Sequence, residues 1–244
     1  MPDKLKHYCL YLDESGGFEE DQEDKMAPPS LIGGVFGEAS AFSRKKARGL
    51  LTQMAEDPQF KAAAGGVPLA VNHCADLPEE TKAPARLQVI RWCAEQGLEF
   101  VFFRSSVKVQ IVDSTQTYLN LLAEGLAQFM AWLSYRGGAK LTVCIGRRVD
   151  VAAYEKDPRM GKQAIPENEY RNIIEARIAI TKARYLFDAG SRVSHEIVFD
   201  SDKENELLVL SDYVCSCRYT MDYTEGPVRR VHPNRSGTKN FRRS

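Results

Sequence analysis

The sequence has no excess charge of either sign, no paired cysteines and no long apolar run. Lys plus Arg and Asp plus Glu number 33 each, so the formal net charge is zero and a uniformly basic surface is excluded. The 6 cysteines include no CxxC pair and no His at zinc-finger spacing, which favours reduced core thiols over a zinc site. Residues 1–6 lack the apolar stretch of a signal peptide, and no run approaches the roughly 18 apolar residues of a membrane span. We therefore expect a cytoplasmic protein.

Hydrophobic strands alternate with amphipathic helices along the chain. This order predicts an α/β fold with a mixed sheet of about five strands flanked by helices. The strands are expected at residues 7–13, 30–36, 98–107, 141–145 and 196–200, and the helices at residues 39–55, 86–95, 114–135, 167–187 and 207–219. Residues 57–84 are expected to be irregular, and residues 151–166 to form a polar insertion. We expect one domain over residues 1–226 and a basic, mobile tail over residues 227–244.

Carboxylates stand at the predicted ends of two strands and on the last helix. Asp13 and Glu14 close the first strand, Asp200 closes the fifth, and Asp212 lies on the helix face that packs on the sheet. Acids in such places are costly to bury unless they are paired, hydrated or bound to a cation. If the first strand is central, the last helix brings Asp212 over Asp13, and a divalent ion would offset their repulsion. The alternatives are a hydrogen-bonded turn at Asp13 and a helix cap or surface ion pair at Asp200.

Two terminal segments resemble the signature motifs of the DUF3800 family. These are YLDESGG at residues 11–17 and LLVLSDYVCSCRY at residues 207–219, in the order and at the ends where the family carries them. The resemblance implies a ribonuclease-H-like fold and a metal-dependent nuclease, often of phage defence or mobile elements. Asp13, Glu14 and Asp212 match the motifs, whereas Val209 replaces the usual Gln near the presumed site.

These observations lead to a first functional hypothesis. Asp13, Glu14, Asp200 and Asp212 would be catalytic, with Asp13, Asp200 and Asp212 holding Mg²⁺ or Mn²⁺ in a phosphodiesterase that acts on RNA, DNA or a hybrid. A second hypothesis is a non-catalytic subunit of a larger assembly, which binds a protein partner, nucleic acid or a second copy. A third is a nucleotide-processing enzyme that uses the same acids.

Basic residues supply candidate contacts to nucleic acid. His73 lies in an extended segment, where it could contact a phosphate or serve only the structure. A pair of arginines follows the fourth strand, and a basic tail ends the sequence; both could hold phosphates, although the first is also typical of a solvated turn and the second of a docking tail. These residues are Arg147, Arg148, Arg229, Arg230, Arg235, Lys239, Arg242 and Arg243.

Overall fold

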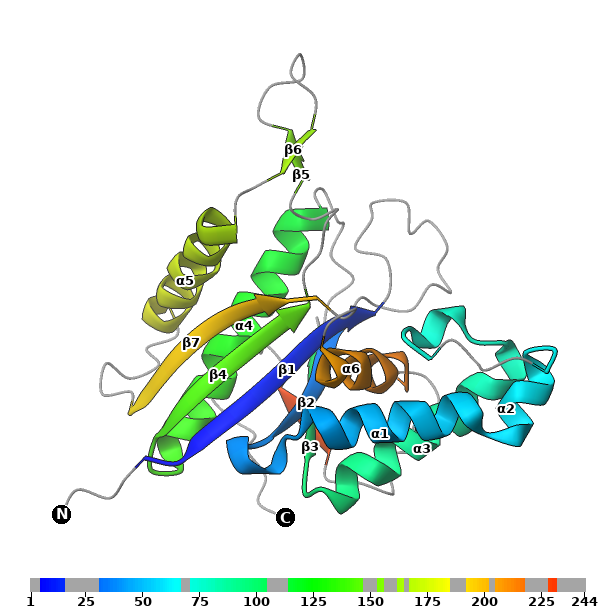
Figure 1. Cartoon of the computed structure of the whole chain (residues 1–244). Helices are drawn as coiled ribbons and strands as arrows, with labels where there is room; N and C mark the ends of the chain where they lie inside the picture. Colours follow the sequence, from blue (N-terminus) through cyan, green and yellow to red (C-terminus); the bar gives the residue numbers. More distant parts are fainter. Residues whose placement is uncertain are drawn as a thin grey trace.

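The computed structural model describes residues 5–15, 31–66, 71–104, 114–146, 153–155, 162–164, 167–184, 192–201, 205–217 and 228–231. Within these ranges six strands form one mixed sheet in the order β7-β4-β1-β2-β3-β8, and β5 pairs with β6 separately (Figure 1). The strands are β1 (His7–Ser15), β2 (Leu31–Glu38), β3 (Glu99–Arg104), β4 (Ala139–Gly146), β5 (Ala153–Glu155), β6 (Lys162–Ala164), β7 (Val193–Asp200) and β8 (Val228–Val231). The predicted α/β class and mixed sheet are confirmed.

Strand direction brings most strand ends to one edge of the sheet. β1 pairs antiparallel with β2 and parallel with β4, β4 pairs parallel with β7, β2 pairs antiparallel with β3, and β3 pairs parallel with β8. In the described sheet β2 is therefore antiparallel to all the other strands. The remaining carboxyl ends share one edge, here called the carboxyl edge, which is where open α/β sheets place their sites. This topology is consistent with a ribonuclease-H-like arrangement.

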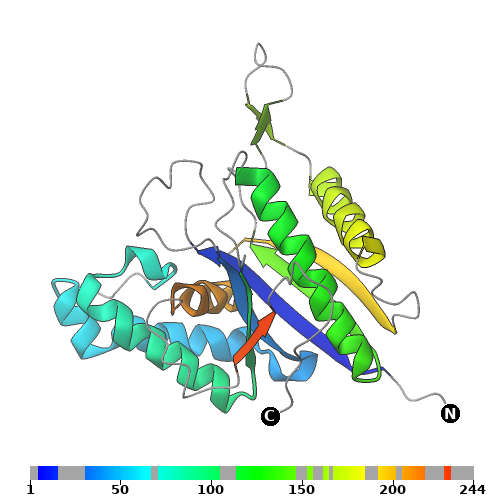
Figure 2. The same ribbon diagram turned by 180° about the vertical axis from the view of Figure 1, so that it is seen from behind.

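Helices cover both faces of the sheet. α4 (Ser114–Tyr135) and α5 (Glu167–Arg184) lie on one face, here called the α4 face (Figure 2). α1 (Arg44–Glu56), α3 (Glu79–Glu95) and α6 (Glu206–Ser216) lie on the opposite face, the α6 face, together with the short α2 (Pro58–Ala63). Each face has its own hydrophobic core, so β1 is central and buried on both sides.

The alternation of side chains along the strands assigns residues to these two cores. Leu10 and Leu12 of β1 belong to the core under α4, whereas Tyr11 packs into the core under α6. In β4, Val143 and Ile145 face α4. Since neighbouring residues in a strand point to opposite faces, Asp13 lies on the α6 face of the sheet.

Two helices begin at other residues than predicted. The helix expected from residue 39 is a short 3-10 turn, η1 (Ala39–Ala41), followed by α1, because Ser43 is the N-cap and its Oγ accepts a hydrogen bond from the Lys46 backbone N–H. The helix expected from residue 86 begins earlier, at Glu79, although Pro84 lies inside it. Buried Thr81 and Ala85 anchor the first two turns of α3, which offsets the hydrogen bond that a proline cannot donate.

The segment from 57 to 84, expected to be irregular, also contains α2 and the 3-10 turn η2 (Cys74–Asp76). Asp57 caps α2, since its Oδ1 accepts from the backbone N–H of Gln59 and Phe60. The insertion at 151–166 contains the paired β5 and β6. No helix in the described part of the chain is long and apolar enough to cross a membrane.

The tail prediction needs a partial correction. Val228–Val231 forms β8 and pairs in parallel with Phe100–Phe103 of β3, so these four tail residues belong to the sheet rather than to a mobile arm. The unpaired edge of β3 explains this pairing, because a strand added there satisfies backbone groups that would otherwise face solvent. The rest of the tail, residues 227 and 232–244, lies outside the described residues.

Candidate metal and nucleic-acid site

The register of the strands aligns two of the predicted acids across the sheet. Gly146 pairs with Asp200, and the β1–β4 register pairs Leu12 with Ile145, which places Gly146 beside Asp13. All three positions lie on the α6 face, because Ile145 and Phe199 face α4. Asp13 and Asp200 therefore flank a glycine at the carboxyl edge.

Gly146 leaves room for the Asp13 carboxylate. A Cβ added at Gly146 would lie 3.3 Å from Asp13 Oδ1, which is closer than a comfortable van der Waals contact. The carboxylate thus lies over the end of β4, on the side of β1 where Asp200 stands. A side chain at position 146 would compete with Asp13 for this space.

Helix α6 is fixed on β1 directly beside these acids. Ser211 Oγ donates a hydrogen bond to the Tyr11 carbonyl at 3.0 Å, and Cys215 Sγ donates to the Asp13 carbonyl at 3.2 Å. The close approach needs a glycine in the neighbouring strand, because a Cβ at Gly34 would lie 1.9 Å from the Tyr11 carbonyl oxygen and 2.9 Å from Ser211 Oγ. The β1–β2 register is continuous through Gly33 and Gly34, so these glycines mark a close backbone contact and not a bulge.

The buried thiol of Cys215 lies within the electrostatic influence of three of the predicted acids. Burial raises its pKa well above the ordinary value, and the charges of Asp13, Asp212 and Glu14 raise it further. These three acids come from β1 and α6, which are 200 residues apart in the chain, yet all act on one sulfur. The predicted approach of α6 to the end of β1 is confirmed by the two hydrogen bonds from Ser211 and Cys215.

Glu14 lies on the other side of the sheet from Asp13. Alternation along β1 gives it the same face as Leu10 and Leu12, and its Oε2 atom is excluded from solvent. Glu14 therefore approaches the carboxyl edge from the α4 face. Its carboxylate and that of Asp13 do not share a face of the sheet.

Asp212 binds the segment that carries His73. Its Oδ2 accepts a hydrogen bond from the Cys74 backbone N–H at 2.7 Å, and His73 Nδ1 lies 4.0 Å from the same oxygen. Asp212 is mostly buried, whereas His73 is more exposed. The structure thus joins two predicted site residues that the sequence places 139 positions apart, and gives Asp212 a structural contact as well.

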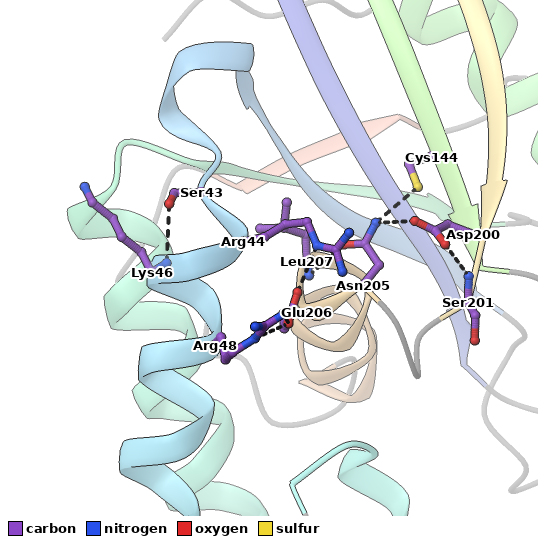
Figure 3. Close-up of polar contacts among 10 residues, drawn as sticks. All are labelled: Ser43, Arg44, Lys46, Arg48, Cys144, Asp200, Ser201, Asn205, Glu206 and Leu207. Carbon is purple, nitrogen blue, oxygen red and sulfur yellow. Dashed lines mark hydrogen bonds and ion pairs between the residues drawn. The ribbon is translucent and has the colours of Figure 1, made fainter.

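Asp200 is oriented by the start of α6. Its Oδ1 accepts from the Ser201 N–H at 2.8 Å and its Oδ2 from Asn205 Nδ2 at 2.9 Å (Figure 3). Asn205 is buried and also caps α6 by accepting from the Leu207 N–H. The helix cap proposed as an alternative role for Asp200 belongs to Asn205, and Asp200 supports that cap.

Sequence reasoning missed a group of ion pairs next to Asp200. Glu206, the first residue of α6, accepts from Arg44 Nε at 2.9 Å and from Arg48 Nε at 2.6 Å (Figure 3). Both arginines lie on α1. The basic run RKKAR at residues 44–48 was the available signal, but nothing in the sequence indicated that α1 would reach the start of α6.

Several of the predicted nucleic-acid-binding residues lie outside the described residues. These are Arg147, Arg148, Arg235, Lys239, Arg242 and Arg243. Arg229 and Arg230 are described only as backbone of β8, where Arg230 pairs with Phe102. Within the described ranges, no three His, Cys, Asp or Glu side chains form a group that could hold a metal ion.

Comparisons with known proteins add no relative. No family model, curated protein or solved structure significantly matches the chain. The α/β sheet and the acids at its carboxyl edge are therefore the observations on which a proposal of function can rest.

Proposed function

We propose that this chain is a DUF3800-type, divalent-metal-dependent phosphodiesterase that acts on nucleic acid. The observation that carries the proposal is the row Asp13, Gly146 and Asp200, in which two carboxylates on one face flank a residue without a side chain. Strands β1, β4 and β7 hold this row, so the separation of the acids is fixed by backbone pairing rather than by loops.

The donor atoms fit Mg²⁺ or Mn²⁺. Both cations prefer hard oxygen ligands, and Mg²⁺ commonly takes one or two carboxylates together with substrate phosphate oxygens and water. Asp13 and Asp200 would be the protein ligands, with Asp212 close by on α6. Bound there, the cation would activate water and neutralise charge on the phosphate.

The chain's own residues position this chemistry. Ser201 and Asn205 hold the Asp200 carboxylate in place, and Cys215 holds the Asp13 backbone against α6. The imidazole of His73 is partly exposed beside Asp212, and it would contact a phosphate oxygen of a bound substrate. Such fixed orientation matters, because a catalytic group that is misplaced by about 1 Å can lose about a hundredfold in rate.

A second function is favoured by a different observation. The Asp212 and Asp200 carboxylates accept hydrogen bonds from Cys74, Ser201 and Asn205, so both have structural work that requires no cation. A non-catalytic subunit that binds a protein partner or nucleic acid would keep these contacts and the fold. In that case Asp200 and Asp212 would serve only to hold α6 and its neighbouring segments in place.

Cleavage assays separate the two functions. Purified protein would be incubated with end-labelled single-stranded RNA, single-stranded DNA, duplex DNA and RNA–DNA hybrid in Mg²⁺, in Mn²⁺ and in EDTA. We expect cleavage of at least one substrate with metal and none in EDTA. Asp13→Asn and Asp200→Asn should each reduce the rate by at least about a hundredfold, since loss of groups that only support a metal ligand already costs 10- to 100-fold.

Asp57→Asn is the matched control for these variants. Asp57 caps α2 away from the carboxyl edge, and Asn caps a helix as well as Asp does. Its cleavage rate should equal that of the wild type. Metal-dependent cleavage that survives both Asp13→Asn and Asp200→Asn would remove these acids from the mechanism, and no cleavage of any substrate would favour the binding subunit.

A further inference from the structure

Helix α1 presents an exposed basic surface. Four of its first five residues are basic, and all four are exposed: Arg44, Lys45, Lys46 and Arg48. We propose that this α1 basic surface binds the phosphate backbone of nucleic acid next to the site at the carboxyl edge. The inference rests on the proposed function and extends it, because it names the surface that holds the substrate outside the reacting phosphate.

Glu206 organises the two arginines. It is largely buried, with 14% of its side chain exposed, whereas Arg44 is 49% and Arg48 is 68% exposed. One carboxylate thus orients two guanidinium groups and neutralises only one charge. Lys45 and Lys46 add two further cations, so the surface keeps a net positive charge. Guanidinium groups held in this way retain donors for phosphate oxygens.

The basic surface is adjacent to the candidate metal ligands. Asn205 donates to Asp200 and is followed in the chain by Glu206, which holds Arg44 (Figure 3). Hydrogen bonding to Glu206 raises the pKa of Arg44, and the charge of Asp200 contributes in the same direction. A strand with one phosphate at the carboxyl edge therefore meets Arg44 first and Arg48 one helical turn later.

Stability alone does not account for this composition. The first turn of a helix favours acids because the helix dipole is positive there, yet α1 has no acid in its first turn. Gly49, inside the same helix, is exposed, and an added Cβ would meet nothing within 4 Å, so no packing requires a glycine. Basic residues at the positive end of a helix add to its attraction for an anion, and an exposed glycine lets a polyanion approach the helix backbone closely.

Binding assays in EDTA test the surface without relying on catalysis. Fluorescence anisotropy would measure affinity for labelled single-stranded RNA, single-stranded DNA and duplex DNA between about 50 and 200 mM salt. For Lys45→Ala/Arg48→Ala we expect at least tenfold weaker binding at the lowest salt. The slope of log K against log salt should fall by about 1.4 to 1.8, because each lost phosphate contact removes about 0.7 to 0.9. The preferred probe identifies the substrate class.

A second variant keeps the ion pairs to Glu206 intact. Lys45→Gln/Lys46→Gln alters neither arginine, so weaker binding by this variant cannot come from a disturbed α1–α6 contact. The control is Lys140→Gln/Arg184→Gln, which removes two exposed cations at the start of β4 and the end of α5. Its affinity and salt slope should equal those of the wild type.

The outcomes separate this inference from the proposed function. Weaker binding by the α1 variants with no cleavage by the wild type supports the surface and refutes the phosphodiesterase. If the wild type cleaves and the α1 variants bind as tightly as the wild type does, the proposal for the α1 basic surface is refuted. The proposed phosphodiesterase is then unaffected. Absence of binding by the wild type to every probe, or α1 variants that change only self-association in sedimentation velocity, would also overturn the proposal for this surface.

Discussion

Asp13→Asn should be at least as stable as the wild type without divalent metal and less stable than the wild type with it. Asp13 and Asp200 stand two strands apart on one face, which corresponds to about 10 Å between their Cα atoms. Two unit charges at that distance repel by about 0.4 kcal/mol in water and by about 1.7 kcal/mol at an effective dielectric constant of 20. In EDTA, Asp13→Asn should therefore be as stable as the wild type or more stable by up to about this amount.

Divalent metal should invert this order. A cation that binds only the folded state adds about 2.7 kcal/mol at a concentration one hundred times its dissociation constant. For a chain of this size, about 1 kcal/mol shifts the melting temperature by about 2–4 °C, so the wild type should gain about 5–11 °C. Asp13→Asn should lose most of that gain, because Asn keeps the shape of Asp but not its charge.

Thermal melts in EDTA, Mg²⁺ and Mn²⁺, with Asp57→Asn as the control, measure both parts. The reasoning fails if Asp13→Asn melts well below the wild type in EDTA, since Asp13 would then be a structural acid rather than a repelled one. It fails equally if the variant gains as much from metal as the wild type does.

Three further predictions address neighbouring groups. Gly146→Ala should retain or slightly raise the melting temperature but reduce metal stabilisation and cleavage, because its Cβ would crowd Asp13 Oδ1; unchanged cleavage would contradict this. Burial raises the pKa of Glu206, but hydrogen bonds from the backbone, Arg44 and Arg48 outweigh it and set the pKa below 4.5. Its stabilisation is therefore present above pH 4.5 and lost as the pH falls through the lower folded value, so the difference in unfolding free energy from Glu206→Gln should shrink there. Iodoacetamide at neutral pH should modify native protein at Cys9 alone, because the other five cysteines are buried; labelling of Cys215 in the folded protein would contradict its burial.

Much of the fold could be predicted from periodicity, and the misses have local causes. The helix at Ser114–Tyr135 matches its predicted bounds, because apolar side chains repeat at helical spacing from Tyr118 to Leu133. α3 was predicted too short because Pro84 is a poor helix residue by propensity, and burial of Ala85 and Val89 overrode that preference. β8 could not be predicted from composition, since pairing with β3 depends on a vacant sheet edge rather than on an apolar pattern.

The sequence indicated which acids make up the candidate site, but not how these acids are arranged. Strand-end and helix-face positions pointed to Asp13, Asp200 and Asp212, and the structure places α6 on β1 as expected. The register that sets Gly146 between Asp13 and Asp200 depends on pairing between strands more than 50 residues apart along the chain, which no local pattern encodes. Glu206 was missed for the same reason, because its partners lie on a helix about 160 residues earlier.

The structural contacts of Asp200 are compatible with the catalytic role that we propose for it. A carboxylate offers about four lone-pair positions, and the hydrogen bonds from Ser201 and Asn205 occupy two of them. These bonds hold the group in one orientation, as the partners of metal-binding carboxylates commonly do. Asn205→Ala should therefore act on Asp200 in two ways, by weakening the α6 cap and by freeing the carboxylate to turn. If Asp200 serves only the cap, the loss of stability should be the same with and without Mg²⁺. If Asp200 also binds the cation, the loss should be larger in Mg²⁺, because a carboxylate that must first be oriented binds the ion less tightly.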